Sequence, residues 1–361
     1  MDVSRCRQST GYIPVLFLTL LTLLLYVVLL TSIIPFLMHE NTADLNDFYY
    51  PNATLVNFVV TNFFFFMATI CFASVSLTEP GKIPAVFPWD PNCPAPSKAE
   101  YYSGGFFRGI ERKLDGRARF CRICGKYKPD RTHHSRNAGQ CVLEMDHYCP
   151  WVQNCIGYRN KKYFFLFITY SAMGLISYCF AIGPLFALLI KPTHAGDTPS
   201  FDLTSGAEVL MIFLIFAFVV AVMLALIVTG YWFFHFWLLT KRFTTVEFCE
   251  KRNADDSKIT DRGERVNVLY SRSPYDLGIY RNLKETLGPN PLLWLIPTRY
   301  GFDSSPYAGC VYEVDEKHAL FKEKNNALLK LLDEKKVAVA GEEPKSEDDY
   351  ANTWTNPLVR A

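Results

Sequence analysis

The sequence predicts an all-α polytopic membrane protein with four transmembrane helices and a zinc-stapled, cysteine-rich cytosolic domain between the second and third helices. Three features of its 361 residues support this fold class. Apolar residues gather into four long runs. Lys and Arg are concentrated in the segments on one side of those runs. Five Cys and three His fall within one short stretch, between Cys121 and Gly157.

The four apolar runs cover residues 13–37, 55–77, 163–190 and 209–240. Each is at least as long as the ~20 residues that a helix needs to cross the hydrocarbon layer. The first three contain no charged residue, and the fourth contains only His235 as an ionisable group. Buried helices of a large soluble protein would rarely be this long and apolar. The first run exceeds a signal-peptide core and lacks a clear cleavage site, so we expect it to remain as a span.

The distribution of basic residues predicts the orientation of the spans. The N-terminal tail (1–12) is basic, and the loop at 78–162 is rich in Lys and Arg. The 38–54 connection has neither, and the 191–208 connection has only Lys191. Because basic segments stay on the cytosolic side, both termini and the central loop are expected there. The cytosolic parts then include 241–300 and a flexible, charged tail at 301–361.

The central loop has the composition of a metal site. Eleven cysteines in a cytosolic setting indicate metal binding or catalysis rather than disulfides. Cys121 and Cys124 form a CxxC pair whose sulfurs can both face one tetrahedral ion at about 2.3 Å. Cys141 and either His133 or His134 are the nearest groups that complete a Cys₃His zinc site. The alternative is a pair of inert thiols.

Asp146, His147 and Cys149 follow directly and have the chemistry of an activated nucleophile. A thiol reacts after it is deprotonated, and a neighbouring imidazole can take the proton. A carboxylate on the far ring nitrogen fixes the tautomer and stabilises the imidazolium. From residue types alone, Cys149 is equally suited to be a further zinc ligand.

Several motifs around the four runs match one known family in the same order. In chain order they are Glu79-Pro80-Gly81, Cys121-x₂-Cys124, Lys128-Pro129-x-Arg131, His133-His134, Cys141-Val142-Leu143-x-Met145-Asp146-His147-Tyr148-Cys149-Pro150-Trp151, Asn154-Cys155-x-Gly157, Thr244-Thr245-Val246-Glu247 and Tyr275-Asp276-Leu277-Gly278 through Asn282 to Gly288. They resemble the DHHC protein S-acyltransferases (palmitoyltransferases), with Tyr148 giving a DHYC variant. The resemblance covers roughly residues 10–300 and places the cysteine-rich domain at about 119–169.

The resemblance implies a set of site residues. Cys149 is the expected nucleophile, His147 its base and Asp146 the orienting carboxylate, with Thr245 supporting Asp146. Asn282 is expected to be a scaffold residue that satisfies buried backbone groups. The family usually binds two zinc ions, and the first ligand set falls on Cys121, Cys124, His134 and Cys141.

The second zinc set departs from the family pattern. It falls on Ser135, Ala138, Tyr148 and Cys155, so three of its four ligands are missing. We therefore expect one zinc and a degenerate second site. Because His147 is retained, we expect activity to survive. The alternative is a catalytically inactive, zinc-stapled membrane adaptor.

The resemblance also implies substrates and partners. The expected acyl donor is palmitoyl-CoA or another long-chain acyl-CoA, and the acceptors are cysteines of membrane-associated proteins in the lipid bilayer. By their charge, Arg131 and Lys128 are candidate contacts for the CoA phosphates, and the alternative is that the basic residues of this loop serve topology and contact anionic lipid. Gly174 either leaves room for an acyl chain or packs against another helix, and we favour packing.

Other functions fit the sequence less well. We expect no nucleic-acid binding, because the basic loop lies at the membrane and carries no recognition-helix signal. A channel or transporter is disfavoured, since His235 is the one ionisable group of the spans. From the resemblance to the family, we expect the protein in the Golgi membrane, with the endoplasmic reticulum and the plasma membrane as alternatives.

Overall fold

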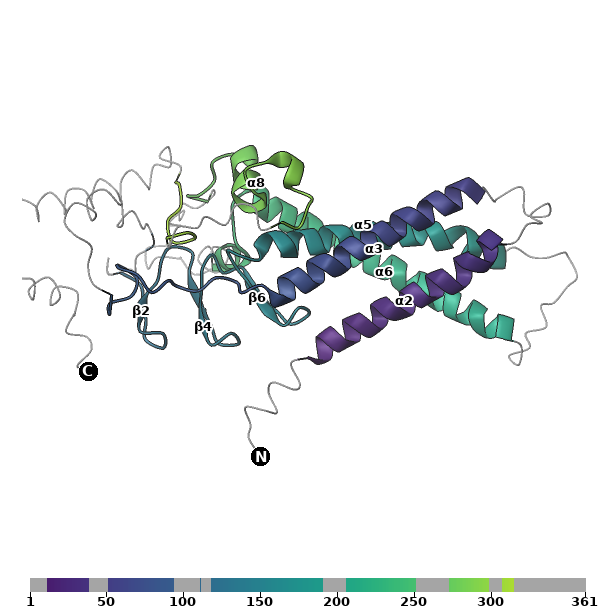
Figure 1. Cartoon of the computed structure of the whole chain (residues 1–361), viewed down its shortest axis with the longest axis horizontal. Coiled ribbons are helices and arrows are strands. Elements are labelled where there is room, and N and C mark those ends of the chain that lie inside the picture. The colour runs from purple at the N-terminus through teal and green to yellow at the C-terminus, as the bar shows by residue number, and fades with distance from the viewer. Residues whose placement is uncertain are drawn as a thin grey trace, which may run out of the picture. The chain divides into compact units, whose positions relative to one another are not determined.

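Long helices carry the four apolar runs. In the computed structural model they are α2 (Ile13–Met38), α3 (Pro51–Leu77), α5 (Lys161–Ile190) and α6 (Gly206–Thr240) (Figure 1). Among the residues that the structure describes, these four are long and apolar enough to cross a membrane. Their length and composition suggest a multi-pass membrane protein.

The structure describes residues 12–38, 51–93, 111, 118–190, 206–250, 273–298 and 307–314. The predictions for the N-terminal tail before residue 12, the 191–208 connection apart from its last three residues, and the tail after 314 lie outside these ranges. The chain divides into two compact units. The helical unit comprises 1–80, 147–238 and 284–301, and the cysteine-rich unit comprises 81–146, 239–283 and 302–361.

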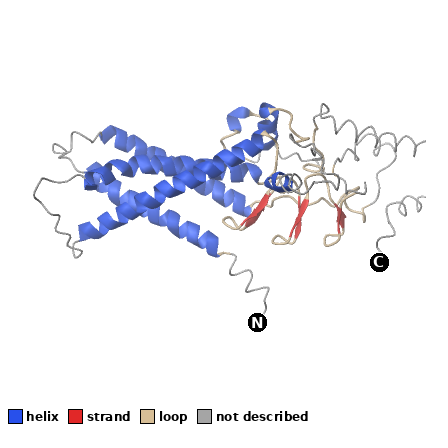
Figure 2. Cartoon of the chain, turned by 180° about the vertical axis from the view of Figure 1, so that it is seen from behind, coloured by secondary structure: helices blue, strands red, loops and turns tan. Residues whose placement is uncertain are grey.

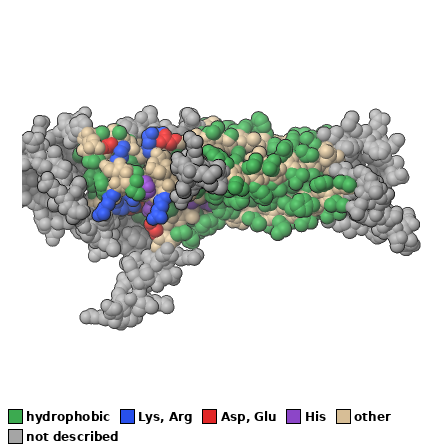
Figure 3. All heavy atoms as spheres, turned by 90° about the horizontal axis from the view of Figure 1, so that it is seen from below, with side chains coloured by type: hydrophobic (Ala, Val, Ile, Leu, Met, Phe, Trp, Pro, Cys, Tyr) green, Lys and Arg blue, Asp and Glu red, His purple; other side chains and the backbone are tan. Residues whose placement is uncertain are grey.

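Helix α5 forms the centre of the helical unit. It packs along α3 and also contacts α2. One core cluster joins α2, α5 and α6 through side chains such as Leu29, Ile182 and Ala221. In contrast, large apolar side chains of α2, α3 and α6 point outward, and Figure 3 shows a largely hydrophobic surface over the helices on the face it presents. Such a surface is unfavourable in water and is suited to lipid.

Small and polar residues set the close contacts between α3 and α5. A Cβ on Gly174 would lie 3.5 Å from the Cβ of Phe64, so this glycine lies directly against α3. The contact supports the packing interpretation of Gly174. Three residues further along α5, the Ser177 hydroxyl lies 2.6 Å from that of Thr61 on α3. Hydroxyl pairs of this kind link helices where water is absent.

Along the chain, three β-hairpins follow α3 and precede α5; their strands are red in Figure 2. They are β1 (Phe120–Cys121) with β2 (Lys126–Tyr127), β3 (His133–Ser135) with β4 (Gln140–Val142), and β5 (His147–Cys149) with β6 (Asn154–Ile156). The all-α prediction therefore holds for the long helices and omits these hairpins. Strands of two or three residues are too short to show an alternating pattern in the sequence.

Asparagine side chains close the ends of two helices. The amide of Asn154 donates to the carbonyls of Val75 and Thr78, where α3 ends, at 2.9 and 2.8 Å. Asn282 is fully buried and donates to the carbonyl of Thr240, the last residue of α6, at 2.8 Å. Orphan carbonyls at a helix end need such partners. The contact agrees with the scaffold role expected for Asn282.

Two short helices follow in the C-terminal part, α8 (Ile279–Leu287) and the 3₁₀ helix η2 (Pro291–Leu293). Residues 307–314, which the sequence places in a flexible tail, are described and partly buried: Cys310 is buried and Tyr312 packs against Tyr275 at a ring distance of 5.6 Å. The expectation of a flexible tail is wrong for this segment, because its aromatic and thiol side chains bury apolar surface.

Candidate metal centre and active site

The first two hairpins bring four metal-ligand side chains together. Cys121 ends β1 and Cys124 lies in the β1–β2 turn, which Gly125 allows by adopting a φ of 63°. His134 and Cys141 lie directly opposite each other on β3 and β4. The Nδ1 atom of His134 lies 3.6, 3.3 and 3.9 Å from the sulfurs of Cys121, Cys124 and Cys141. All four ligand atoms lie within 4.8 Å of one another.

This geometry fits zinc. Ligand bonds of about 2.3 Å to sulfur and 2.0–2.1 Å to nitrogen, at tetrahedral angles, place sulfur and nitrogen about 3.5 Å apart. His133 points elsewhere, with its Nδ1 3.7 Å from a carboxylate oxygen of Glu250. The structure therefore selects His134 over His133. Four protein ligands leave no open position, so a zinc ion here would be structural.

Asp146 is held by the N-terminus of the helical turn that follows α6. Both the backbone N–H and the hydroxyl of Thr245 donate to its carboxylate, at 3.0 and 2.7 Å. Thr244 and Glu247 form a capping box around the same turn. The Thr244 N–H donates to Glu247 at 2.8 Å, and the Glu247 N–H donates to the Thr244 hydroxyl at 3.2 Å. The motif Thr-Thr-x-Glu thus builds a rigid helix start that fixes a buried carboxylate.

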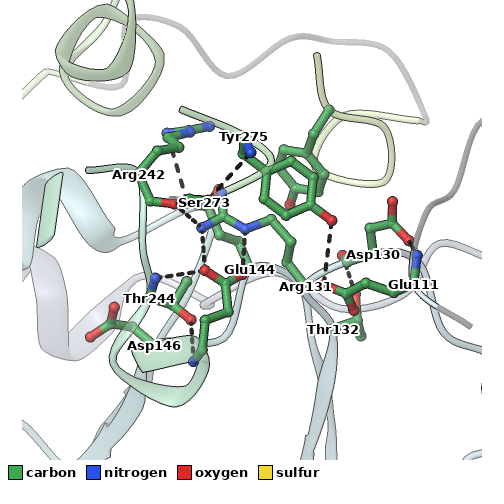
Figure 4. A network of polar contacts seen from close by, with 12 residues as sticks. Glu111, Asp130, Arg131, Thr132, Glu144, Asp146, Arg242, Thr244, Ser273 and Tyr275 are labelled. Carbon is green, nitrogen blue, oxygen red and sulfur yellow. Dashed lines mark hydrogen bonds and ion pairs between the residues drawn. The ribbon is translucent and has the colours of Figure 1, made fainter. Parts of the chain in front are cut away.

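Arg131 lies at the centre of a buried ion-pair network (Figure 4). Its guanidinium donates to both carboxylate oxygens of Glu247, at 2.6 and 3.0 Å, and lies 3.1 Å from Glu144. It also donates to the carbonyl of Arg242 at 3.1 Å. The Arg131 side chain has 0% exposure. Burial alone would lower its pKa, but Glu144 and Glu247 outweigh burial and raise the pKa well above its usual value.

Two tyrosine rings cover the Arg131 guanidinium. The ring centres of Tyr275 and Tyr312 lie 4.7 and 5.3 Å from its central carbon, within the range of cation–π contacts. Burial raises the pKa of both phenols well above the usual value, so both stay neutral. Since every side of Arg131 is occupied within the cysteine-rich unit, the expectation that it contacts CoA phosphates is wrong. Sequence cannot separate a buried Arg from an exposed one in a basic loop.

His147 and Cys149 lie on β5, in the helical unit, and Asp146 is the last residue of its segment in the cysteine-rich unit. Cys149 is buried and pairs in register with Asn154, the residue that closes α3. The His147 ring meets Phe164 of α5 edge to face, with ring centres 5.0 Å apart. The hairpin thus presents the thiol and the imidazole from the same strand, next to the start of α5.

Comparison with known proteins agrees with this geometry. The model of the DHHC palmitoyltransferase family matches residues 115–252. The chain is 32% identical over 240 residues to probable protein S-acyltransferase 15 of Arabidopsis thaliana, covering 65% of this chain and 82% of the relative. The chain belongs to the DHHC S-acyltransferase family.

Two further relatives show how far the similarity extends. Probable protein S-acyltransferase 14 of Arabidopsis thaliana is 30% identical over 249 residues, covering 68% of this chain and 72% of the relative. Palmitoyltransferase ZDHHC15 of Xenopus laevis is 38% identical over 187 residues. That match covers 52% of this chain, and the chain spans about half (48%) of that relative.

The positions expected for a second zinc set carry Ser135, Ala138, Tyr148 and Cys155 in this chain. Ser135 now closes the β3–β4 turn by accepting a hydrogen bond from the Ala138 N–H at 3.2 Å. Tyr148 lies directly opposite Cys155 in the β5–β6 register. Within the described ranges, Cys121, Cys124, His134 and Cys141 make up the one group suited to hold a metal. In the β3–β4 and β5–β6 hairpins, the residues at these positions take part in strand pairing and in the turn hydrogen bond.

Sequence reasoning did not find several residues of this DHHC site. Glu144, Arg242 and Tyr312 complete the Arg131 network, and Phe164 and His235 surround His147. For His235 a signal existed, because it is the one ionisable group in its apolar run. For the others, residue type and spacing carry no signal that separates them from ordinary loop or helix residues.

Proposed function

We propose that this chain transfers a long-chain acyl group, such as palmitoyl, from acyl-CoA through a thioester on Cys149 to cysteines of membrane-associated proteins. The observation that carries the proposal is the carboxylate of Asp146, fixed by two hydrogen bonds from Thr245 and joined directly to the strand that holds His147 and Cys149. Membership of the S-acyltransferase family supports the same reaction.

The proposed reaction has two steps. His147 takes the thiol proton of Cys149, and the thiolate attacks the thioester carbonyl of acyl-CoA. The bond to the CoA sulfur breaks, and the His147 imidazolium returns its proton to the CoA thiolate. A substrate cysteine, deprotonated by His147, then attacks the Cys149 thioester and releases the free Cys149 thiol. Asp146 stabilises the imidazolium in both steps.

We further propose that the four long helices cross the membrane with both termini and the cysteine-rich unit in the cytosol. The outward-facing apolar side chains of α2, α3 and α6 support contact with lipid. Moving each methylene of an acyl chain from water into apolar surroundings is favourable by about 0.8 kcal/mol of free energy. A site at the membrane therefore allows the acyl chain to stay out of water during the reaction. The Golgi is the proposed compartment on family habit alone.

The proposed metal content is one structural zinc ion on Cys121, Cys124, His134 and Cys141. The fit of the four ligand atoms to tetrahedral zinc supports it. The ion would tie the β1–β2 turn to the β3–β4 hairpin, which leads along the chain to Asp146.

The test is incubation of the purified full chain with a labelled palmitoyl-CoA analogue, followed by neutral hydroxylamine. We expect label that hydroxylamine removes, lost in Cys149→Ser and kept in the matched control Cys249→Ser, whose thiol is exposed. If Cys149→Ser loses the label and Cys249→Ser keeps it, the thioester is on Cys149. Absence of label from folded, zinc-loaded wild-type protein would overturn the proposal in favour of the inactive adaptor.

A further inference from the structure

His235 is a buried imidazole within a long apolar helix. It lies near the end of α6, and 6% of its surface is exposed. Ionisable side chains inside apolar spans are costly to bury, and where they occur they commonly serve function. Nothing in the reaction described above uses this residue.

The aromatic rings that contact His235 include that of His147, the proposed base. Tyr231, one turn earlier on α6, meets His235 at 4.4 Å between ring centres, and Phe164 of α5 meets it at 5.1 Å. The His147 ring lies 5.8 Å from His235 and 5.0 Å from Phe164. Phe164 therefore contacts both imidazoles edge to face, at interplanar angles of 73° in each case. His147, Phe164 and His235 form a closed triangle of rings within the helical unit.

This triangle restrains a side chain that its own strand cannot orient. His147 sits on a three-residue strand, and rotation about the bond to an imidazole ring has a broad, shallow preference. Edge-to-face contacts favour particular ring planes. Phe164 of α5 meets His147 edge to face, and the His235 ring of α6 packs against it at an interplanar angle of 47°. These two contacts together select an orientation of His147 that neither helix would select alone.

We propose that His235 is a positioning residue for His147: with Phe164 it fixes the plane of the His147 ring for proton transfer with Cys149. The inference deepens the proposed function and rests on it. Phe164, His147 and His235 contact one another through their rings, and in this proposal ring shape carries the effect. A phenyl group at position 235 replaces the imidazole, whereas an aliphatic side chain of similar volume does not.

The test compares His235→Leu with His235→Phe in the purified full chain. Phe233→Ala is the matched control, because Phe233 lies on the same helix with 61% exposure. The first readout is the rate constant for Cys149 acylation and the KM for palmitoyl-CoA. The second is alkylation of Cys149 by iodoacetamide without acyl-CoA, followed by mass spectrometry of the Cys149 peptide. Zinc content and thermal midpoint confirm folding.

We expect His235→Leu to lower the acylation rate constant and the alkylation rate by about 10- to 100-fold, the scale of a misplaced catalytic group. The KM should change by less than about twofold, since only the chemical step loses an interaction. His235→Phe should restore most of both rates, and Phe233→Ala should match wild type. Phe164→Leu, which removes the shared ring, should resemble His235→Leu.

Two results would overturn the inference. One is wild-type acylation and alkylation in His235→Leu. The other is an equal loss in His235→Phe and His235→Leu, which would assign the effect to the polarity of the imidazole. If wild-type protein is not acylated at Cys149, the proposed function fails. In that case the alkylation rates still decide whether His235 positions His147.

Discussion

At the scale of single residues, the candidate site depends on two charged groups held in different ways. Asp146 is buried, and two hydrogen bonds from Thr245 hold its carboxylate. Arg131 is buried among carboxylates and tyrosine rings. In the proposed reaction Asp146 orients His147, and Arg131 has a structural role only.

Thr245→Val tests the support of Asp146. Valine keeps the shape and the backbone N–H but removes the hydroxyl that donates at 2.7 Å. A hydrogen bond to a charged group contributes about 1.5–3 kcal/mol, so we expect Cys149 acylation to slow by about tenfold or more. Thr245→Ser keeps the hydroxyl and serves as the control. Equal rates in the valine and serine variants would show that the hydroxyl is dispensable.

Arg131→Met tests the ion-pair network. The substitution leaves the buried Glu144 and the partly exposed Glu247 without their main counter-charge, which should destabilise the fold by about 3–5 kcal/mol. Arg131→Lys keeps the charge but loses the two-pronged contact with Glu247, so the loss should be smaller. The measurement is the thermal unfolding midpoint in detergent, with exposed Arg136→Met as the control. A midpoint unchanged in Arg131→Met would argue against the network as a source of stability.

At the scale of elements, the hairpins of the central region are too short to be stable alone. Strands of two or three residues form few ladder hydrogen bonds, and an isolated hairpin is marginal in water. A zinc ion on Cys121, Cys124, His134 and Cys141 would join two of them. The β5–β6 hairpin has no such set of ligands in the described chain, and Asn154 ties it to the end of α3.

Zinc content and zinc removal test this account. We expect about one zinc per chain by elemental analysis, and a strong fall in the thermal midpoint after chelation, because metal binding contributes directly to folding. Cys124→Ser should reproduce the loss, and Cys249→Ser should not. A ratio near two would mean that the region around Ser135 and Cys155 binds metal despite its changed residues.

At the scale of the whole molecule, four long helices and an uneven charge distribution predict its orientation in a membrane. Helix α5 is the most buried of the four, and α2, α3 and α6 present apolar side chains outward. By the positive-inside rule, the basic residues of the central loop predict that this loop lies in the cytosol.

Glycosylation mapping of the full chain tests this orientation. Acceptor sites introduced into the 38–54 and 191–208 connections should be modified in a microsomal system, because we expect these segments in the lumen. Sites added before residue 12 or after residue 314 should remain unmodified. Modification at either terminus would contradict the four-span arrangement with cytosolic ends.

Much of this protein follows from local sequence. The length of an apolar run determines whether a helix can span a bilayer, and the spacing of Cys121 and Cys124 suits one metal ion; both properties belong to single segments. Residue chemistry suggested Asp146, His147 and Cys149 as an activated nucleophile but left Cys149 equally suited to bind zinc. Similarity to a known family favoured the nucleophile, added Thr245 and selected His134. Strands of two or three residues are too short to be predicted from the alternation of polar and apolar residues.

Only the tertiary structure decided what the chain brings together from distant segments. Arg131 and Glu247 are 116 residues apart, and their contact turned an expected phosphate ligand into a buried structural ion pair. His147 and His235 come from a hairpin and a helix separated by the whole of α5. Spacing along the chain says nothing about such contacts, because they exist only after the helices and hairpins have packed and excluded water.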